Sequence, residues 1–220
     1  MRADRKLLIG VLALVAMGCG GSSHTDDAQI ATDAAVRVEA EGCHEPHSIG
    51  SGSFVAAHRV VTVAHVVAGA TDIDVVLANG TEAQATLIAI DRKKDLAVLS
   101  VDLDVVPLTL GTMRVGAKGE FVAWRGGTAK AMPFSAAAIV DINAADIDHE
   151  GPSLRRGYRI LAAVEQGDSG SVLVSHGVAV AVIFARSESD GSRAWATAIT
   201  EAKELLSTTG DSAIDAGVCP

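Results

Sequence analysis

The sequence predicts an all-β protein that is folded as two barrels. Hydrophobic residues make up 49% of the 220 positions but aromatic residues only 3%. The core must therefore consist of Val, Ala, Leu and Ile, and the β-branched members of this set favour strands. Short apolar runs form two groups on either side of residues 102–116, a stretch that contains Pro107 and little strand pattern. A chain of this length can bury a sizeable core, so we expect one barrel from each group.

The runs that predict strands are separated by Gly, Asn or charged turns. Asn79-Gly80 is a strong hairpin signal, and Thr200 is a suitable cap for a terminal helix over about 200–207. We expect barrel 1 at about 45–105 and barrel 2 at about 115–200. The predicted strands are residues 53–56, 60–63, 73–77, 83–90 and 96–101, then 120–124, 132–142, 158–164, 171–174, 178–185 and 193–198.

The first 18 residues have the composition of an export signal. A basic start precedes the apolar stretch Leu7–Met17, which is too short to span a bilayer. Ala16-Met17-Gly18-Cys19 resembles a bacterial lipobox, in which Cys19 becomes the lipidated first residue. The alternative is a plain secretory signal with an incidental cysteine. Gly20 is not the aspartate associated with inner-membrane retention, which favours the outer membrane.

Residues 19–42 are rich in Gly, Ser, Thr, Asp and Ala, and they predict a flexible tether before a folded domain at 43–220. With Cys19 lipidated, Cys43 and Cys219 remain as an even pair in an oxidising compartment. We expect a disulfide between them, and the alternative is two free thiols. The formal net charge of -9 argues against nucleic acid and against anionic membranes as partners. Membrane attachment would therefore depend on lipid, and we expect a monomer because the tether has no aromatic anchor for assembly.

Three short segments carry the chemistry. They are Val63-Ala64-His65, Asp95-Leu96-Ala97-Val98 and Gly167-Asp168-Ser169-Gly170, and they occur in the order His, Asp, Ser. This order differs from that of subtilisin-type enzymes and of the α/β-hydrolase fold. It resembles the trypsin/chymotrypsin-like serine peptidases.

The finer pattern is similar to the bacterial HtrA-like branch of that family. The matching segments are residues 50–55 (GSGSFV), 59–67 (RVVTVAHVV) and 91–101 (DRKKDLAVLSV). The resemblance implies two six-stranded antiparallel barrels and a short C-terminal helix. About fifty residues follow Ser169, so we expect no PDZ domain.

The resemblance also implies a role for each residue of the site. Ser169 would be the nucleophile, His65 the base, and Asp95 the group that fixes the imidazole tautomer. The backbone N–H groups of Gly167 and Ser169 would form an oxyanion hole. The implied activity is that of a serine endopeptidase acting on protein or peptide substrates, with no cofactor and no metal.

Specificity is predicted from the residues around the nucleophile. Ala163 occupies the position where a trypsin-type enzyme holds an acidic residue, and Val182, Ile183 and Phe184 would line the opposite wall. This predicts cleavage after small or medium aliphatic residues. Glu165 is either a charge at the rim or an element of basic specificity, and the rim is favoured because charged side chains are seldom fully buried.

Asp168 needs a partner, because no Ile-Val-Gly-Gly-like activation site precedes the domain to supply a new N-terminus. The alternatives are local N–H groups or one of three arginines, Arg125, Arg155 and Arg156.

Two other functional readings are open. One is a catalytically silent binding lipoprotein of the cell envelope with the same fold. The other is a serine esterase, which is disfavoured because Gly167-Asp168-Ser169-Gly170-Ser171 lacks the second glycine of the nucleophile elbow. Cys43-His44-Glu45-Pro46-His47 contains metal-capable side chains but has no second ligand cluster.

Overall fold

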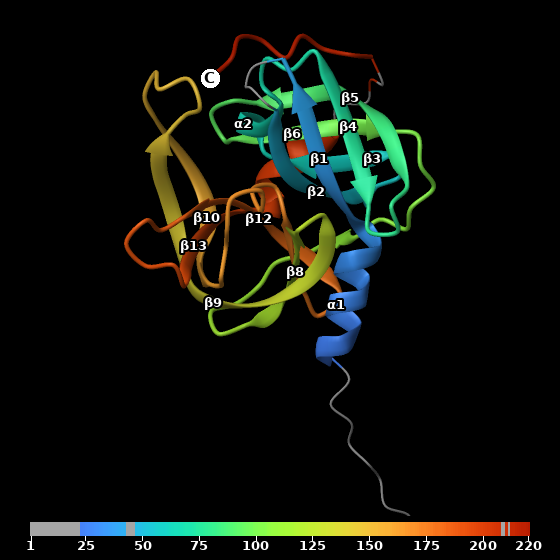
Figure 1. Cartoon of the computed structure of the whole chain (residues 1–220). Coiled ribbons are helices and arrows are strands. Elements are labelled where there is room, and N and C mark those ends of the chain that lie inside the picture. The colour runs from blue at the N-terminus through green and yellow to red at the C-terminus, as the bar shows by residue number, and fades with distance from the viewer. Residues whose placement is uncertain (1–22, 43–46, 208–209, 211) are drawn as a thin grey trace, which may run out of the picture.

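The first barrel is closed by six antiparallel strands in the order β1-β2-β3-β6-β5-β4, with β4 paired back to β1. Figure 1 shows these strands gathered in one half of the molecule. Alternate residues of β1 face inward, because Val36 and Val38 are fully buried while Arg37 between them is only half-buried. The strands are β1 (Ala35–Glu41), β2 (Ser48–Ala56), β3 (Arg59–Thr62), β4 (Asp72–Leu77), β5 (Glu82–Asp91) and β6 (Leu96–Val101).

The second barrel is a seven-stranded sheet in the order β11-β8-β9-β10-β13-β12-β7. An additional pairing of β12 with β11 joins six of these strands into a ring, and β7 runs parallel to β12 outside it. A separate apolar cluster fills this ring. The strands are β7 (Thr109–Leu110), β8 (Lys118–Arg125), β9 (Thr128–Ala145), β10 (Pro152–Leu161), β11 (Val172–Ser175), β12 (Val178–Arg186) and β13 (Arg193–Ala198).

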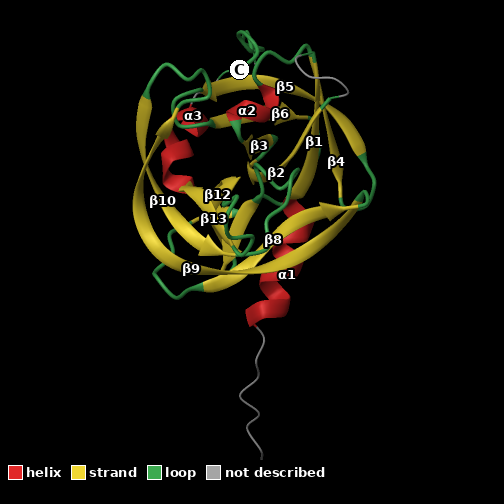
Figure 2. Cartoon of the chain, turned by 60° about the vertical axis from the view of Figure 1, so that its left-hand side comes forward, coloured by secondary structure: helices red, strands yellow, loops and turns green. Residues whose placement is uncertain are grey.

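These two barrels confirm the predicted trypsin-like all-β architecture. In Figure 2 strands make up nearly all of both barrels, and short helices lie at their margins. The predicted C-terminal helix is also present, as a 3-10 turn, η1 (Ile199–Ala202), that continues into α3 (Lys203–Ser207). Ile199, Ala202 and Leu205 are buried, so this element packs against the body of the protein.

The predicted tether is wrong for residues 23–41. They form a 12-residue helix, α1 (Ser23–Ala34), and the strand β1 that completes barrel 1. Ala31 and Ala34 are buried, and the carboxylate of Asp27 accepts the N–H groups of His176 and Gly177 at 3.0 and 2.6 Å. Small side chains let the helix approach β8 closely, so it needs no apolar stripe of large residues. Barrel 1 therefore begins at Ala35 rather than near residue 45.

The computed structural model describes residues 23–42, 47–207, 210 and 212–220. The predicted signal peptide, the lipidation site Cys19 and the cysteine Cys43 lie outside these ranges. Cys219 is disulfide-bonded, and its pairing with Cys43 stays a prediction. Across the described ranges, no helix is long and apolar enough to cross a membrane.

Candidate active site

His65 lies on a one-turn helix, α2 (Ala64–Val67), that follows directly after β3. The other residues of this helix are buried, whereas the side chain of His65 is 34% exposed. Burial of the neighbours fixes the helix and leaves the imidazole at the surface. The ring is thus held rigidly but remains accessible to a substrate.

Asp95 binds both the backbone and the ring of His65. Its Oδ1 accepts the His65 backbone N–H at 2.9 Å, and its Oδ2 lies 2.8 Å from His65 Nδ1. The Asp95 side chain is only 6% exposed. A buried carboxylate at this distance holds the proton on Nδ1 and leaves Nε2 free to act as a base.

The backbone of Asp95 is in the left-handed region, with φ of 55°. Asp is among the few residues that tolerate this conformation. Upstream in the same turn, the Asp91 carboxylate accepts the backbone N–H groups of Lys93 and Lys94 at 3.0 and 2.8 Å. The turn between β5 and β6 is therefore organised around its own acidic side chains.

Ser169 lies in the loop between β10 and β11, which is joined to barrel 1. Its carbonyl oxygen accepts the Ser51 N–H at 2.7 Å. Gly50 lies between this loop and α2, because a Cβ there would lie 2.7 Å from Val66 Cγ2 and 3.0 Å from Ser169 O. The structure thus brings the predicted nucleophile loop against the helix that carries His65.

The glycines of the loop have backbone conformations that other residues rarely adopt. Gly167 and Gly170 have φ of 93° and 92°. A Cβ on Gly170 would lie 1.9 Å from Ser51 O. Within the described part of the chain, the N–H groups of Gly167 and Ser169 donate to no protein acceptor. Both predicted oxyanion-hole donors are therefore available to a ligand.

Ser51 is a residue of the site that the sequence analysis missed. Its Oγ donates to the carbonyl of Gly167 at 2.9 Å, while its own carbonyl accepts the buried Thr62 hydroxyl at 2.7 Å. These bonds fix the peptide that follows Gly167. The sequence feature that could have identified Ser51 is its place between Gly50 and Gly52, because glycines allow another backbone to approach closely, here that of residues 167–169.

Arg125 is the arginine that pairs with Asp168. Its Nη1 and Nη2 each lie 2.7 Å from one oxygen of the carboxylate, which is fully buried. The hydrogen bond to Asp168 raises the pKa of Arg125 above its ordinary value, although burial acts in the opposite direction. The carboxylate also accepts the Glu165 N–H at 2.8 Å. The Asp168 carboxylate thereby ties the segment before Ser169 to Arg125 at the end of β8.

The side chain of Glu165 is 66% exposed, and its Oε2 lies 3.3 Å from Nε of Arg125. Its charge is therefore partly compensated by Arg125, and its place at the rim of a specificity pocket stays a prediction.

The predicted pocket wall is wrong for two residues. Val182 and Ile183 are both fully buried, the first in the apolar cluster of barrel 1 and the second in that of barrel 2. A strand buried on both faces has no side chain free to line an open pocket. Ala163 is exposed and Phe184 is half-buried, and a pocket role for Ala163 stays a prediction.

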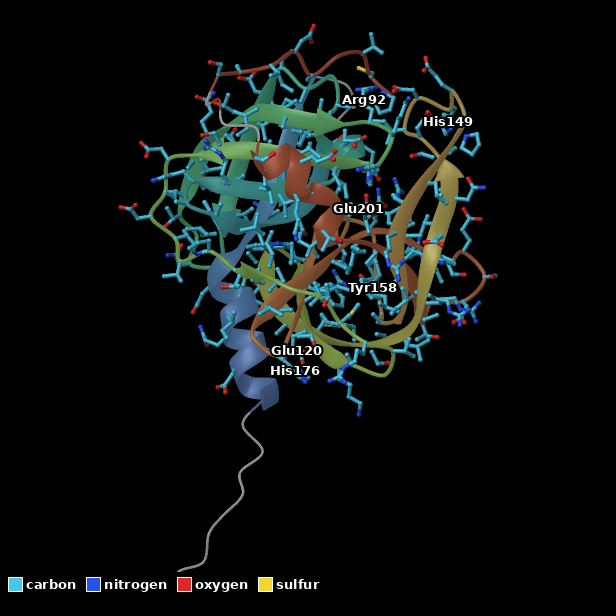
Figure 3. All side chains as sticks on the ribbon, turned by 180° about the vertical axis from the view of Figure 1, so that it is seen from behind. Arg92, Glu120, His149, Tyr158, His176 and Glu201 are labelled. Carbon is cyan, nitrogen blue, oxygen red and sulfur yellow. The ribbon has the colours of Figure 1, made fainter. Side chains whose placement is uncertain are left out.

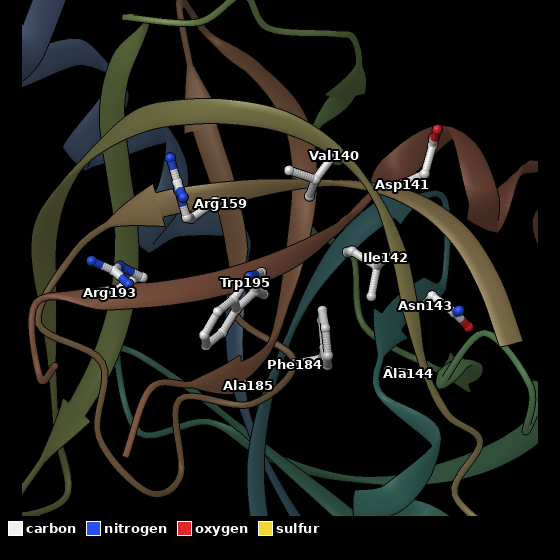
Figure 4. Close-up of a pocket in the computed structure, with 10 residues that line it drawn as sticks. All are labelled: Val140, Asp141, Ile142, Asn143, Ala144, Arg159, Phe184, Ala185, Arg193 and Trp195. Atoms are coloured by element: carbon white, nitrogen blue, oxygen red, sulfur yellow. The ribbon is translucent and has the colours of Figure 1, made fainter. Parts of the chain in front are cut away.

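Phe184 instead lines a pocket of about 430 Å³ on the outer face of β9, β10, β12 and β13. In Figure 4, Phe184, Trp195 and Ile142 form its apolar part, with Arg159 and Arg193 at one end and Asp141 and Asn143 at the other. Phe184 follows Ile183, whose backbone N and O bond to Ser171 O and Gly170 N at 2.9 and 2.8 Å. The pocket thus begins one residue from the backbone that supports the nucleophile loop.

Across the described ranges, no group of three or more His, Cys, Asp or Glu side chains is arranged to hold a metal ion. His44 and Glu45 of the metal-capable segment lie outside those ranges.

Comparison with known proteins identifies the family. Residues 50–182 match the trypsin-like peptidase domain family. Serine protease Rv3671c of Mycobacterium tuberculosis is 32% identical over 178 residues, which are 77% of this chain and 44% of that protein. A probable periplasmic DegP-like serine endoprotease of Halomonas elongata is 44% identical over 81 residues, which are 36% of this chain and 17% of that protein. This chain thus spans less than half the length of these relatives.

Solved structures agree with this relationship. The active form of the Rv3671c protease superposes with a TM-score of 0.81 at 24% identity, over 97% of this chain and 99% of that one, and shows the shared fold. The HtrA-type protease AlgW with a tripeptide superposes at 0.73 with 26% identity, over 84% of this chain and 62% of that one. The family match covers more than half of the sequence, and the chain belongs to the trypsin-like peptidase domain family.

Proposed function

We propose that this chain is a serine endopeptidase that cleaves peptide bonds with His65, Asp95 and Ser169. The observation that carries the proposal is the pair of hydrogen bonds that the buried Asp95 carboxylate accepts from the backbone and the ring of His65. This contact commits the imidazole to one tautomer, which is useful to a proton-transferring group. The serine protease relatives support the same activity.

In the proposed reaction, Ser169 Oγ attacks the substrate carbonyl carbon while its proton passes to His65 Nε2. The N–H groups of Gly167 and Ser169 bind the oxygen on which negative charge develops. The C–N bond then breaks, and His65 gives its proton to the leaving amine, which leaves an acyl-enzyme on Ser169. A water molecule next attacks the ester carbon as His65 removes its proton. The product acid departs, and Ser169 regains its hydrogen.

Arg125 has a defined place in this proposal. It pairs with Asp168, which lies between Gly167 and Ser169 in the sequence, so a cation of the chain itself orders the loop. We expect the full chain to be active without proteolytic activation.

For specificity, the exposed Ala163 and the half-buried Phe184 support a preference for small or medium aliphatic side chains at the cleaved bond. Neither Ala163 nor Phe184 carries an acidic group that would attract Lys or Arg. Profiling with a peptide library tests this, and a preference for basic residues would contradict it.

The proposed location is the bacterial cell envelope, with export directed by residues 1–18 and a lipid on Cys19. The periplasmic assignment of the Halomonas elongata relative supports export. Incorporation of labelled palmitate into the wild-type chain but not into Cys19→Ala would support the anchor. A wild-type chain that is exported without palmitate, with Cys19→Ala exported equally well, would point to the plain signal peptide.

The activity is tested by labelling the full chain with a fluorophosphonate probe. We expect the wild type to react and Ser169→Ala and His65→Ala to be unreactive, because only an activated serine attacks the probe. Ser189→Ala serves as the control, since Ser189 is an exposed hydroxyl of the β12–β13 turn. Absence of labelling in a folded wild-type chain would refute the proposal and favour the silent binding protein.

A further inference from the structure

Arg155 is a buried cation that the proposed reaction does not use. It lies on β10 in the second barrel, and only 3% of the residue is exposed. Its Nη1 donates to the carbonyl of Lys93 at 3.3 Å, and its guanidinium carbon lies 4.2 Å from the ring centre of Phe184. Its Nε is buried without a hydrogen-bond partner among the described residues.

These contacts join two parts of the candidate site. Lys93 lies two residues before Asp95 in the turn between β5 and β6, and Phe184 lines the pocket on the second barrel. Arg155 thus connects barrel 2 to the turn that carries Asp95. A guanidinium presents a planar group for ring stacking together with directed N–H donors, a combination that Lys lacks.

Stability alone does not account for this residue. Burial of a charge costs free energy unless the charge is well paired, and an apolar side chain of similar volume often serves the fold as well or better. Burial is the largest influence on Arg155 and lowers its pKa, while the negative charges of Asp95, Asp91 and Glu201 raise it. Arg155 is therefore attracted by the charge of Asp95, although burial disfavours its own charged form.

The charged surroundings of Arg155 come from three elements. Strand β5 supplies Asp91, the β5–β6 turn supplies Asp95, and η1 supplies Glu201. Lys94 of the same turn pairs with Glu201 at 3.2 Å, and Glu201 also accepts the backbone N–H of Arg156 at 3.3 Å. Glu201 is therefore shared with another cation, which leaves Asp95 as the largest attractive influence on Arg155.

The same turn is held from its outer side. Arg92 pairs with Asp148 of the β9–β10 hairpin through Nε at 2.8 Å, and it donates to the carbonyls of Ala216 and Val218. In Figure 3, Arg92 and His149 lie at one end of the molecule, and Glu201 lies between them and Tyr158 in this view. Arg92 is partly exposed, whereas Arg155 reaches the turn from the buried side. Arg155 also connects the turn to Phe184.

We propose that Arg155 is a positioning residue that holds the Asp95 turn against Phe184 and thereby keeps the Asp95 carboxylate aligned with His65. The proposal rests on the proposed function for its kinetic consequences. When Arg155 is replaced, the turn is no longer held to barrel 2, and the Asp95 carboxylate loses its fixed orientation toward His65.

The test compares Arg155→Met with Arg155→Lys in the full chain, with Arg156→Met as the matched control. Arg156 is the next residue on the strand, its side chain is exposed, and it carries the same charge. For Arg155→Met we expect kcat per titrated active site to fall about tenfold, since misplacement of the Asp95 turn misorients the base. Arg155→Lys should keep most of kcat and change mainly KM, because an N–H donor remains for the Lys93 carbonyl while the planar contact to Phe184 is lost.

A second measurement separates this proposal from the proposed function. The NMR chemical shift of the His65 Nδ1 proton reports the hydrogen bond to Asp95, and in the inactive Ser169→Ala background it needs no catalysis. Arg155→Met should change this resonance. An unchanged resonance together with an unchanged kcat per active site would overturn the proposal, even with a lower melting temperature. An equal change in Arg156→Met would overturn it as well, because it would mean that loss of a charge on this strand is responsible and not the contact of Arg155. Absence of probe labelling in the wild type would instead overturn the proposed function, and the resonance would still decide the role of Arg155.

Discussion

The ion pair between Arg125 and Asp168 allows a sharp test of how the nucleophile loop is held. In Arg125→Met the carboxylate, which is fully buried, loses two hydrogen bonds of 2.7 Å and retains the single N–H donor of Glu165. Removal of one partner from a buried pair typically costs about 3–5 kcal/mol. We expect the lower end, about 3 kcal/mol, because the Arg125 side chain is 19% exposed. For a domain of this size that corresponds to a fall of roughly 6–12 °C in melting temperature.

The assay is thermal unfolding of the full chain, followed by circular dichroism, together with the rate of fluorophosphonate labelling. The double variant Arg125→Met/Asp168→Asn should recover about half of the lost stability, since no unpaired charge remains buried. Arg114→Met is the control, because Arg114 is exposed on the same barrel. Labelling should slow in Arg125→Met, as Asp168 stands between Gly167 and Ser169. A melting temperature within 2 °C of the wild type, or a double variant no more stable than the single one, would refute this reasoning.

Other contacts give further predictions. Asp95→Asn should lower kcat by about 10⁴-fold with little change in folding, because an amide stabilises the wrong imidazole tautomer; a fall below tenfold in steady-state kinetics would argue against the assigned role. Gly170→Ala should destabilise the chain by several kcal/mol in urea unfolding, because the Cβ of the new alanine would lie 1.9 Å from Ser51 O and the backbone has φ of 92°. Gly191→Ala should leave stability unchanged, because Gly191 has open space around it. Asp27→Ala should lower the free energy of unfolding by about 1–3 kcal/mol, because two N–H groups lose their acceptor. Asp26→Ala, on the exposed side of α1, should leave stability unchanged. Equal losses of stability in the two variants would disprove a specific role for Asp27.

The strands and the chemically important segments were predictable because their signals are local. Short β-rich apolar runs mark most strands of both barrels, and the order of His65, Asp95 and Ser169 indicates the family that the comparison shows. The first strand carried the same alternation in Val36 and Val38, but the polar composition around it obscured the pattern. Helix α1 was not predictable in this way, because its buried face consists of alanines and one aspartate whose partners lie about 150 residues away.

The predicted pocket wall on β12 shows where the alternation of buried and exposed residues along a strand fails as a guide. Val182 and Ile183 point to opposite faces of β12, yet both are buried, because this strand lies between the two apolar clusters. A bulge between Ile183 and Ala185 then shifts the register with β13. Neither feature is encoded in residues near the strand. The choice of Arg125 among three arginines likewise depends on which strand lies beneath the nucleophile loop.

Helix α1 and strand β1 have a consequence for the order in which the chain can fold. Strand β1 pairs with both β2 and β4, and α1 docks on the turn that contains His176 and Gly177. During synthesis or export with the N-terminus first, this docking surface emerges about 150 residues after Asp27. A 12-residue helix is marginal on its own, so α1 must wait for the second barrel. The two barrels should therefore complete folding as one cooperative unit, and a chain truncated before β11 should be recognised as unfinished by proteases.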